Sequence, residues 1–337
     1  MRYLAYKFLI LILLSINLPH VHAAASLPFH HIIFFGDSLT DNGNLYNSPW
    51  NPKGIPKSPP YYKGRFTNGD VWADHVAAYF NKTRKIKSEN YAYGGEALAY
   101  HGPDYLPWIF NESVTSYYWY TNKSTYSDTL YIIWLGGNDY IEGGVSDIEG
   151  YTDKMIYNLN YSIDRLIRNG GKNFLIINLP DLSKSPYSKI KRTTGNVAAL
   201  IASHNAKLEI MVNTLRENYS GIQAEVYHVD ALVNEFLSMD LTATNKKYNM
   251  HISEIERPCW EGGYSLIQNG LGKTDDYTIK SPSLHEAFLT AQKASSGIVS
   301  CENPDNYIFW DKIHPSRVMH EFFSQKIIEY IEQHYFN

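Results

Sequence analysis

Short apolar runs alternate with helical patterns along most of the chain, and this alternation predicts the fold class. Five runs have the length and the β-branched or aromatic content of buried strands, the second of them more weakly than the others. They are HIIFF at 31–35, a run near 86–92, TLYIIWL at 129–135, NFLIINL at 173–179 and EVYHV at 225–229. Strands that alternate with helices form a parallel sheet with helices on both faces. The pattern therefore predicts an α/β fold with a parallel sheet of about five strands.

Apolar residues recur at helical spacing between and after these runs. The helical segments are 70–80, 153–168, 193–217 and 316–334. His204 lies on the apolar stripe of the third segment, and we interpret it as a core histidine. The chain has 337 residues, 44% of them hydrophobic, which is enough for one large core or two small ones. We predict a single three-layer α/β/α domain over residues 24–337.

Two regions depart from this alternation. Residues 100–128 are rich in Tyr and Trp, which either pack at the bases of loops or have a functional role as an acyl-chain wall or a lipid-interface patch. Residues 240–305 are predicted to be a long irregular stretch, and such a stretch in a compact domain is usually functional. Within it, residues 283–294 have helical spacing and are a candidate lid helix.

The first residues have the pattern of a secretory signal peptide. Arg2 and Lys7 form a basic start, residues 8–17 are apolar, and small residues precede a cleavage site after Ala23. The apolar run is shorter than the roughly 20 residues that a membrane-spanning helix needs. We therefore predict a signal peptide over 1–23 and a secreted protein.

The chain has two cysteines, Cys259 and Cys301. An even number of cysteines in an exported chain suggests a disulfide, with two buried free thiols as the alternative. A disulfide would bracket the loop or lid at 259–301.

Composition and motifs argue against several partners and cofactors. The net charge is −4 and Lys and Arg form no basic stripe, so we expect no nucleic-acid partner. No HExxH pattern occurs, and we expect no metal site. GLGKT at 270–274 resembles a P-loop, but Ile267 stands where the first glycine of that motif belongs. We therefore expect no nucleotide and no other cofactor.

Residues capable of chemistry follow the predicted strands or precede the last helix. They are Ser38 after the first strand, Gly94 and Gly95 after the second, Asn138 after the third, and Asp311 and His314 before the last helix. In an open parallel sheet, ligands bind at the carboxyl ends of the strands. These residues are therefore expected to meet at one edge of the sheet.

The residue types at this edge suggest a serine nucleophile. A serine hydroxyl needs a base in contact and donors for the negative charge that develops. His314 would take the proton from Ser38, and Asp311 would orient the imidazole. The Asn138 amide, a glycine N–H and the Ser38 backbone N–H would form an oxyanion hole.

The residues around Ser38 have structural interpretations. Gly36 permits a tight exit from the strand. Asp37 and Asp41 are interpreted as turn or cap residues, and Asn44 could steady the loop.

The chain resembles the GDSL, or SGNH, hydrolase family over roughly 31–335. The matching blocks, in order, are FFGDSLTDNGN, NYAYGGEA, LGGND and WDKIHPS, with GRFTNGDVWADHVA at 64–77 as a signature of larger members. The resemblance implies a flavodoxin-like three-layer fold. It implies Ser38, Asp311 and His314 as catalytic residues, and Ser38, Asn138 and Gly95 as oxyanion donors, Gly95 being favoured over Gly94.

Within this family the chain most resembles secreted bacterial lysophospholipase A and glycerophospholipid:cholesterol acyltransferase enzymes. That resemblance implies a secreted serine ester hydrolase that acts through an acyl-enzyme on lysophospholipids or other lipid esters. A sterol or another alcohol would be a further acyl acceptor. The resemblance also implies transient contact with a membrane surface and an activating protease that cuts the loop between the cysteines.

Two other functions fit part of the pattern. A carbohydrate acetylesterase would use the same site, with aromatic residues stacked on sugar rings. A catalytically silent lipid- or glycan-binding protein is disfavoured because the Ser-Gly-Asn-His set is complete.

Overall fold

The computed structural model of the chain describes residues 27–49, 51, 54–99, 109–261 and 301–336. The predicted signal peptide at 1–23, the candidate lid helix at 283–294 and the GLGKT segment lie outside the described residues. The same holds for residues 100–108 of the aromatic region.

The strands are β1 (His31–Gly36), β2 (Lys87–Asn90), β3 (Thr129–Trp134), β4 (Asn173–Ile177), β5 (Gln223–Tyr227), β6 (Glu254–Pro258) and β8 (Tyr307–Phe309). The α-helices are α1 (Asn44–Asn47), α2 (Trp72–Arg84), α3 (Phe110–Tyr120), α4 (Gly137–Tyr140), α5 (Ile148–Arg168), α6 (Pro186–Lys191), α7 (Thr194–Asn218), α8 (Val229–Ser238), α9 (Leu241–Tyr248) and α11 (Arg317–Tyr335). Short 3-10 helices are η1 (Lys123–Asp128), η2 (Leu182–Lys184) and η3 (Pro304–Asn306).

The main sheet has five strands in the order β2-β1-β3-β4-β5, and every neighbouring pair is parallel. The chain leaves β1 for β2 on one side and then returns to β3 on the other side of β1. The strand order therefore reverses between β1 and β3, the point at which ligands bind in flavodoxin-like sheets. The predicted fold class is confirmed.

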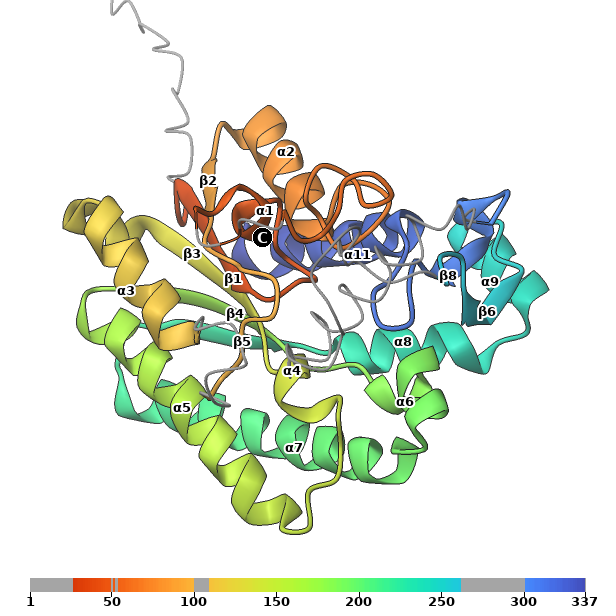
Figure 1. Cartoon of the computed structure of the whole chain (residues 1–337). Helices are drawn as coiled ribbons and strands as arrows, with labels where there is room; N and C mark the ends of the chain where they lie inside the picture. Colours follow the sequence, from red (N-terminus) through yellow and green to blue (C-terminus); the bar gives the residue numbers. More distant parts are fainter. Residues whose placement is uncertain (1–26, 50, 52–53, 100–108, 262–300, 337) are drawn as a thin grey trace, which may run out of the picture.

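Helices cover both faces of this sheet (Figure 1). Helices α2 and α11 pack together on one face, while α3, α5 and α7 lie on the other. Every residue of β3 is buried, because strands in the middle of the sheet are covered from both sides. The edge strand β2 has no fully buried residue, which explains why its sequence signal is weak.

All five predicted strands and all four predicted helices are present, with shifted ends. Helix α5 begins at Ile148 rather than at residue 153, because the Asp147 side chain accepts a hydrogen bond from the Gly150 N–H and caps an earlier turn. Strand β5 begins at Gln223 rather than at residue 225, and Val229 belongs to α8.

The prediction that 240–305 is irregular is wrong for its described part. Helix α9 lies there, and β6 pairs with β8 in a second, two-stranded sheet. Helix α9 buries only Thr244, so it lacks the apolar stripe by which a helix is recognised in a sequence. Strand β6 contains no fully buried residue.

Cys259 and Cys301 form the predicted disulfide, with their Cα atoms 4.9 Å apart. Backbone hydrogen bonds from Cys259 to Phe309 and from Trp260 to Trp310 join the bridge to the segment that leads into Asp311. The disulfide therefore anchors the end of β6 beside the predicted Asp-His block.

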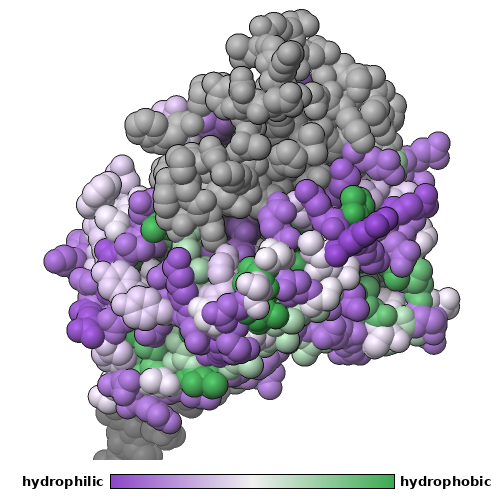
Figure 2. Space-filling model, turned by 60° about the horizontal axis from the view of Figure 1, so that its bottom comes forward, coloured by the Kyte–Doolittle hydropathy of each residue, from purple (hydrophilic) through white to green (hydrophobic). Residues whose placement is uncertain are grey.

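Surface hydrophobicity is dispersed in the view of Figure 2, where apolar side chains alternate with polar ones among the coloured residues. Within the described ranges, no helix combines the length and the apolar character needed to cross a bilayer.

Candidate active site

Ser38 lies in a tight turn directly after β1. A Cβ atom at Gly36 would lie 2.6 Å from the Thr40 Oγ1 atom and 2.7 Å from the Trp134 carbonyl oxygen, so glycine is needed at this exit. The turn is closed by the backbone N–H groups of Thr40 and Asp41, which both donate to the Asp37 carbonyl at 2.9 Å. Ser38 is thereby fixed at the carboxyl end of a buried strand.

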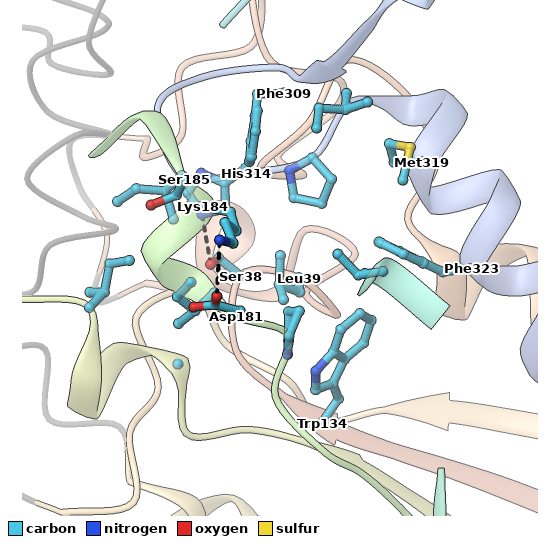
Figure 3. A pocket seen from close by; sticks show the side chains of 18 of the residues that line it. Ser38, Leu39, Trp134, Asp181, Lys184, Ser185, Phe309, His314, Met319 and Phe323 are labelled. Carbon is cyan, nitrogen blue, oxygen red and sulfur yellow. Dashed lines mark hydrogen bonds and ion pairs between the residues drawn. The ribbon is translucent and has the colours of Figure 1, made fainter. Parts of the chain in front are cut away.

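The structure brings Ser38, His314 and Asp311 into one hydrogen-bonded series, of which Figure 3 shows Ser38 and His314. The His314 Nε2 atom lies 2.8 Å from the Ser38 Oγ atom, and its Nδ1 atom lies 2.7 Å from the Asp311 Oδ2 atom. All three side chains are buried. A hydroxyl, an imidazole and a carboxylate in this order can generate a serine nucleophile.

The Asp311 carboxylate accepts four hydrogen bonds. Besides the His314 ring, the donors are the Tyr61 hydroxyl at 2.7 Å and the backbone N–H groups of Ile313 and His314 at 2.8 and 2.7 Å. Burial alone would raise the pKa of Asp311, but the charge of His314 and these hydrogen bonds outweigh it and hold the pKa below its ordinary value. The ionised carboxylate keeps the proton on Nδ1 and leaves Nε2 able to accept from Ser38.

Tyr61 was not predicted as a site residue. It is 2% exposed and packs edge-on against Trp310, with ring centroids 6.2 Å apart. Its sole cue in the sequence is its place just before the GRFTNG block.

The GRFTNG block holds the Asp-His segment in place. The Thr67 hydroxyl donates to the Pro315 carbonyl at 2.9 Å, and the Arg317 N–H donates to the Asn68 side chain at 2.7 Å. The Phe66 ring lies against the His314 ring with centroids 5.3 Å apart. These contacts explain why this block accompanies the catalytic blocks in the sequence.

The two glycines after β2 have different hydrogen bonds. The Gly94 N–H donates to the Asp41 Oδ2 atom at 2.7 Å, so it is already used. Gly95 has a φ of 81°, and its N–H makes no hydrogen bond to any residue within the described ranges. This arrangement supports Gly95, rather than Gly94, as the candidate oxyanion donor.

Asp41 ties the turn after Ser38 to the turn after β2. Its carboxylate accepts hydrogen bonds from the backbone N–H groups of Gly43, Asn44, Leu45 and Gly94 at 2.8, 2.6, 3.2 and 2.7 Å. The first three fit the predicted cap role, whereas the bond to Gly94 links two separate blocks and was not predicted.

Asn138 lies at the start of α4, directly after β3. It is 7% exposed and lines the same cavity as Ser38. Its Nδ2 group donates to the Glu96 carbonyl at 2.8 Å, and the Asp139 carboxylate accepts from Leu98 N–H at 2.9 Å. The turns after β2 and β3 are therefore joined, which holds the Asn138 amide next to the glycine pair.

Burial shifts the pKa of several carboxyl groups in this part of the site. Burial raises the pKa of Asp37 to about 7 and that of Asp41 to about 6. Burial also raises the pKa of Glu96 well above its ordinary value. His204 is buried as predicted; burial lowers its pKa to about 3, and its Nδ1 atom lies 2.8 Å from the Tyr140 hydroxyl.

A cavity of about 110 Å³ opens at Ser38, many times the volume that one water molecule needs. Ser38, Asn138 and His314 line one end. The other end is apolar and is formed by β3, α8, β8 and α11 through Trp134, Val233, Phe236, Leu237, Ile308, Phe309, Met319 and Phe323. Figure 3 shows Trp134, Met319 and Phe323 across the cavity from Ser38.

Residues 109–128 do not contribute to this cavity. Phe110 and Tyr117 instead pack against Phe35 of the sheet, which supports the packing interpretation of these rings. Trp119 and Tyr120 are 75% and 80% exposed and stay available for surface contact.

Within the described residues, no group of His, Cys, Asp and Glu side chains is arranged to hold a metal ion.

A parallel sheet with a Ser-His-Asp series at its topological switch point is the architecture of a serine hydrolase. The chain belongs to the GDSL-like lipase/acylhydrolase family, whose model matches residues 32–327. Family membership identifies the protein as a carboxylic-ester hydrolase of the GDSL esterase/lipase class.

Similar proteins include three bacterial relatives. A phosphatidylcholine-sterol acyltransferase of Aeromonas hydrophila is 28% identical over 94% of this chain and 94% of its own length. A thermolabile hemolysin of Vibrio parahaemolyticus is 25% identical over 88% of this chain and 63% of its own. A secreted effector protein of Salmonella typhimurium is 25% identical over 90% of this chain and 64% of its own. The chain thus spans less than two thirds of the last two relatives.

Among solved structures, an acetyl-xylooligosaccharide esterase of Geobacillus is similar with a TM-score of 0.41. It is 11% identical, and the match covers 89% of this chain and 93% of that one.

Proposed function

We propose that the protein hydrolyses lipid esters through an acyl-enzyme on Ser38, with lysophospholipase A or phospholipase A activity. The observation that carries the proposal is the position of the Ser38–His314 pair at one end of an apolar cavity. The proposal assigns catalysis to Ser38, His314 and Asp311 and the oxyanion hole to Ser38, Gly95 and Asn138.

In the acylation step, the Ser38 Oγ atom attacks the ester carbonyl and its proton passes to His314 Nε2. Asp311 stabilises the imidazolium that forms. Negative charge on the carbonyl oxygen is stabilised by the backbone N–H groups of Ser38 and Gly95 and by the Asn138 amide. His314 then protonates the leaving alcohol as the carbon–oxygen bond breaks. A water molecule repeats the sequence on the acyl-enzyme and releases the fatty acid.

The apolar end of the cavity favours a long acyl chain over an acetyl group. Each buried methylene group contributes about 0.8 kcal/mol to binding, whereas an acetyl ester would leave the apolar end of the cavity unfilled. For this reason we prefer a lipid ester to an acetylated carbohydrate. Similarity to a phosphatidylcholine-sterol acyltransferase supports acyl transfer to a sterol or another alcohol as a second outcome.

The proposal also covers export and activation. Residues 1–23 would direct secretion of a single hydrolase domain, residues 24–337, that touches membrane surfaces transiently. A protease cut between Cys259 and Cys301 would raise activity by freeing a lid while the disulfide retains both pieces. Equal turnover of cut and uncut protein would contradict this activation step.

A fluorophosphonate probe tests the enzyme assignment, because it reacts with an activated serine and spares a catalytically silent binding protein. We expect labelling of the natural protein and none of Ser38→Ala, with both proteins melting at similar temperatures. Hydrolysis of long-chain lysophosphatidylcholine should exceed hydrolysis of acetyl-xylan. The opposite preference would indicate a carbohydrate acetylesterase, and an active Ser38→Ala protein would refute the acyl-enzyme.

A further inference from the structure

Two opposite charges lie where the cavity opens beside the Ser38–His314 pair. Asp181 and Lys184 belong to the turn and short helix η2 that follow β4, at the same sheet edge as Ser38. Figure 3 shows both side chains next to Ser38 and His314, opposite the apolar end. Lys184 is the only Lys or Arg among the described residues that line the cavity.

The pair is loosely held. The Lys184 Nζ atom lies 3.8 Å from the Asp181 Oδ2 atom, and the two side chains are 58% and 27% exposed. Exposed ion pairs of this kind contribute little to stability, so binding of another anion can replace this one at low cost. The Asp181 carboxylate is fixed independently, because its Oδ1 atom accepts a hydrogen bond from the Ser183 N–H at 3.0 Å.

We infer that this pair binds the headgroup of a zwitterionic phospholipid, with Lys184 on the phosphate and Asp181 on the quaternary ammonium. The inference rests on the proposed function, which places the acyl chain in the apolar end and the ester carbonyl at Ser38. The headgroup must then lie at the opposite, charged end of the cavity. An ammonium group is a strong donor to phosphate oxygens, and a neighbouring carboxylate complements the choline cation.

The contribution of the headgroup can be measured with esters that share one short acyl chain, because their acyl-chain contacts and reacting carbonyl are identical. The substrates are 1-hexanoyl-lysophosphatidylcholine and phosphate-free 1-hexanoylglycerol, each used as a monomer in solution. In Lys184→Gln, the ratio of kcat/KM for the first substrate to that for the second should fall about tenfold. Lys184→Arg should retain most of this ratio. The matched control is Lys246→Gln on α9, an exposed lysine away from the cavity, which should leave both rates unchanged.

Asp181→Asn tests the second contact, since the amide oxygen can still accept from the Ser183 N–H. The ratio of kcat/KM for 1-hexanoyl-lysophosphatidylcholine to that for 1-hexanoyl-lysophosphatidylglycerol should fall about threefold. The glycerol headgroup has no cation for the carboxylate to bind.

The two proposals fail in different ways. An unchanged ratio in Lys184→Gln, or an equal loss on both substrates, overturns the headgroup site while ester hydrolysis stands. A higher kcat/KM of the unsubstituted protein for 1-hexanoylglycerol than for 1-hexanoyl-lysophosphatidylcholine would also overturn the headgroup site. Absence of fluorophosphonate labelling at Ser38 overturns the proposed function itself.

Discussion

The cavity has two walls that differ in how their side chains are held. On the polar wall, formed by Ser38, Asn138 and His314, hydrogen bonds fix the candidate catalytic groups, as the bonds from His314 to Ser38 and to Asp311 behind it illustrate. On the apolar wall, Phe236, Met319 and Phe323 are positioned by packing of α8 and α11. Changes to the polar wall should therefore alter the rate on every ester, and changes to the apolar wall should alter which ester is preferred.

The largest effect on the polar wall after loss of Ser38 is expected from Asn138→Ala. Removal of one oxyanion donor should lower kcat by about 10²–10³ on short and long acyl chains alike. Steady-state kinetics on a series of p-nitrophenyl esters measures this. Asn213→Ala, an exposed change on α7, is the control. A fall in kcat of less than tenfold, or one confined to esters with long acyl chains, would contradict the assignment of Asn138 as an oxyanion donor.

Asp41→Asn should have the next largest effect. The substitution replaces one of the two oxygens that hold Gly43, Asn44, Leu45 and Gly94, so the Gly94–Gly95 turn loses a hydrogen bond. We expect kcat to fall about 10- to 100-fold on all esters. Urea denaturation shows how much of the change is lost stability.

Glu96→Gln is the matched control for Asp41→Asn. Glu96 is equally buried and its pKa is also raised by burial, so Glu96→Gln makes the same carboxyl-to-amide change at a buried position that does not bind the Gly94 N–H. An equal fall in kcat in the two variants would show that any change among these buried carboxyl groups disturbs the site. It would contradict a specific role of Asp41 in positioning the Gly94–Gly95 turn.

Tyr61→Phe should lower kcat/KM about tenfold and shift its pH dependence. The Tyr61 hydroxyl stabilises the ionised form of Asp311, so its removal raises the pKa of that carboxyl. Activity should then decline at a higher pH than in the natural protein as the solution is acidified. A pH–rate profile from pH 4 to 9 measures the shift, with exposed Tyr157→Phe as the control. A uniform loss with an unmoved profile would assign Tyr61 a purely structural role.

The smallest effect is expected on the apolar wall. Met319→Trp adds bulk to the cavity and should lower the ratio of dodecanoyl to butanoyl ester hydrolysis about fivefold, while overpacking costs about 1–3 kcal/mol of stability. Val318→Leu, at a neighbouring α11 position that does not line the cavity, should leave the ratio unchanged. An unchanged ratio in Met319→Trp would place the acyl chain elsewhere.

The two walls also differ in what the sequence could predict. Ser38, Asn138 and His314 lie in short sequence blocks next to predicted strands or helices. Their proximity could therefore be predicted from the parallel arrangement of the strands. Tyr61 was not predicted, because it contacts Asp311 across 250 positions and its place just before the GRFTNG block does not reveal that contact. Met319 and Phe323 lie on a helix whose apolar residues all resemble core residues in the sequence. Only the packing of α8 and α11 determines which of them border the cavity.

The His314 imidazole that contacts the Ser38 hydroxyl lies 276 positions later in the chain. On the proposed mechanism, a polypeptide that is still being synthesised, or that is threaded unfolded through a translocation channel, cannot yet hold the Ser38 nucleophile against its His314 base. The proposed hydrolytic activity would therefore arise only when α11, which follows His314, docks beside α2. Cellular membranes would thus be spared by the timing of folding, before any protease or lid takes part.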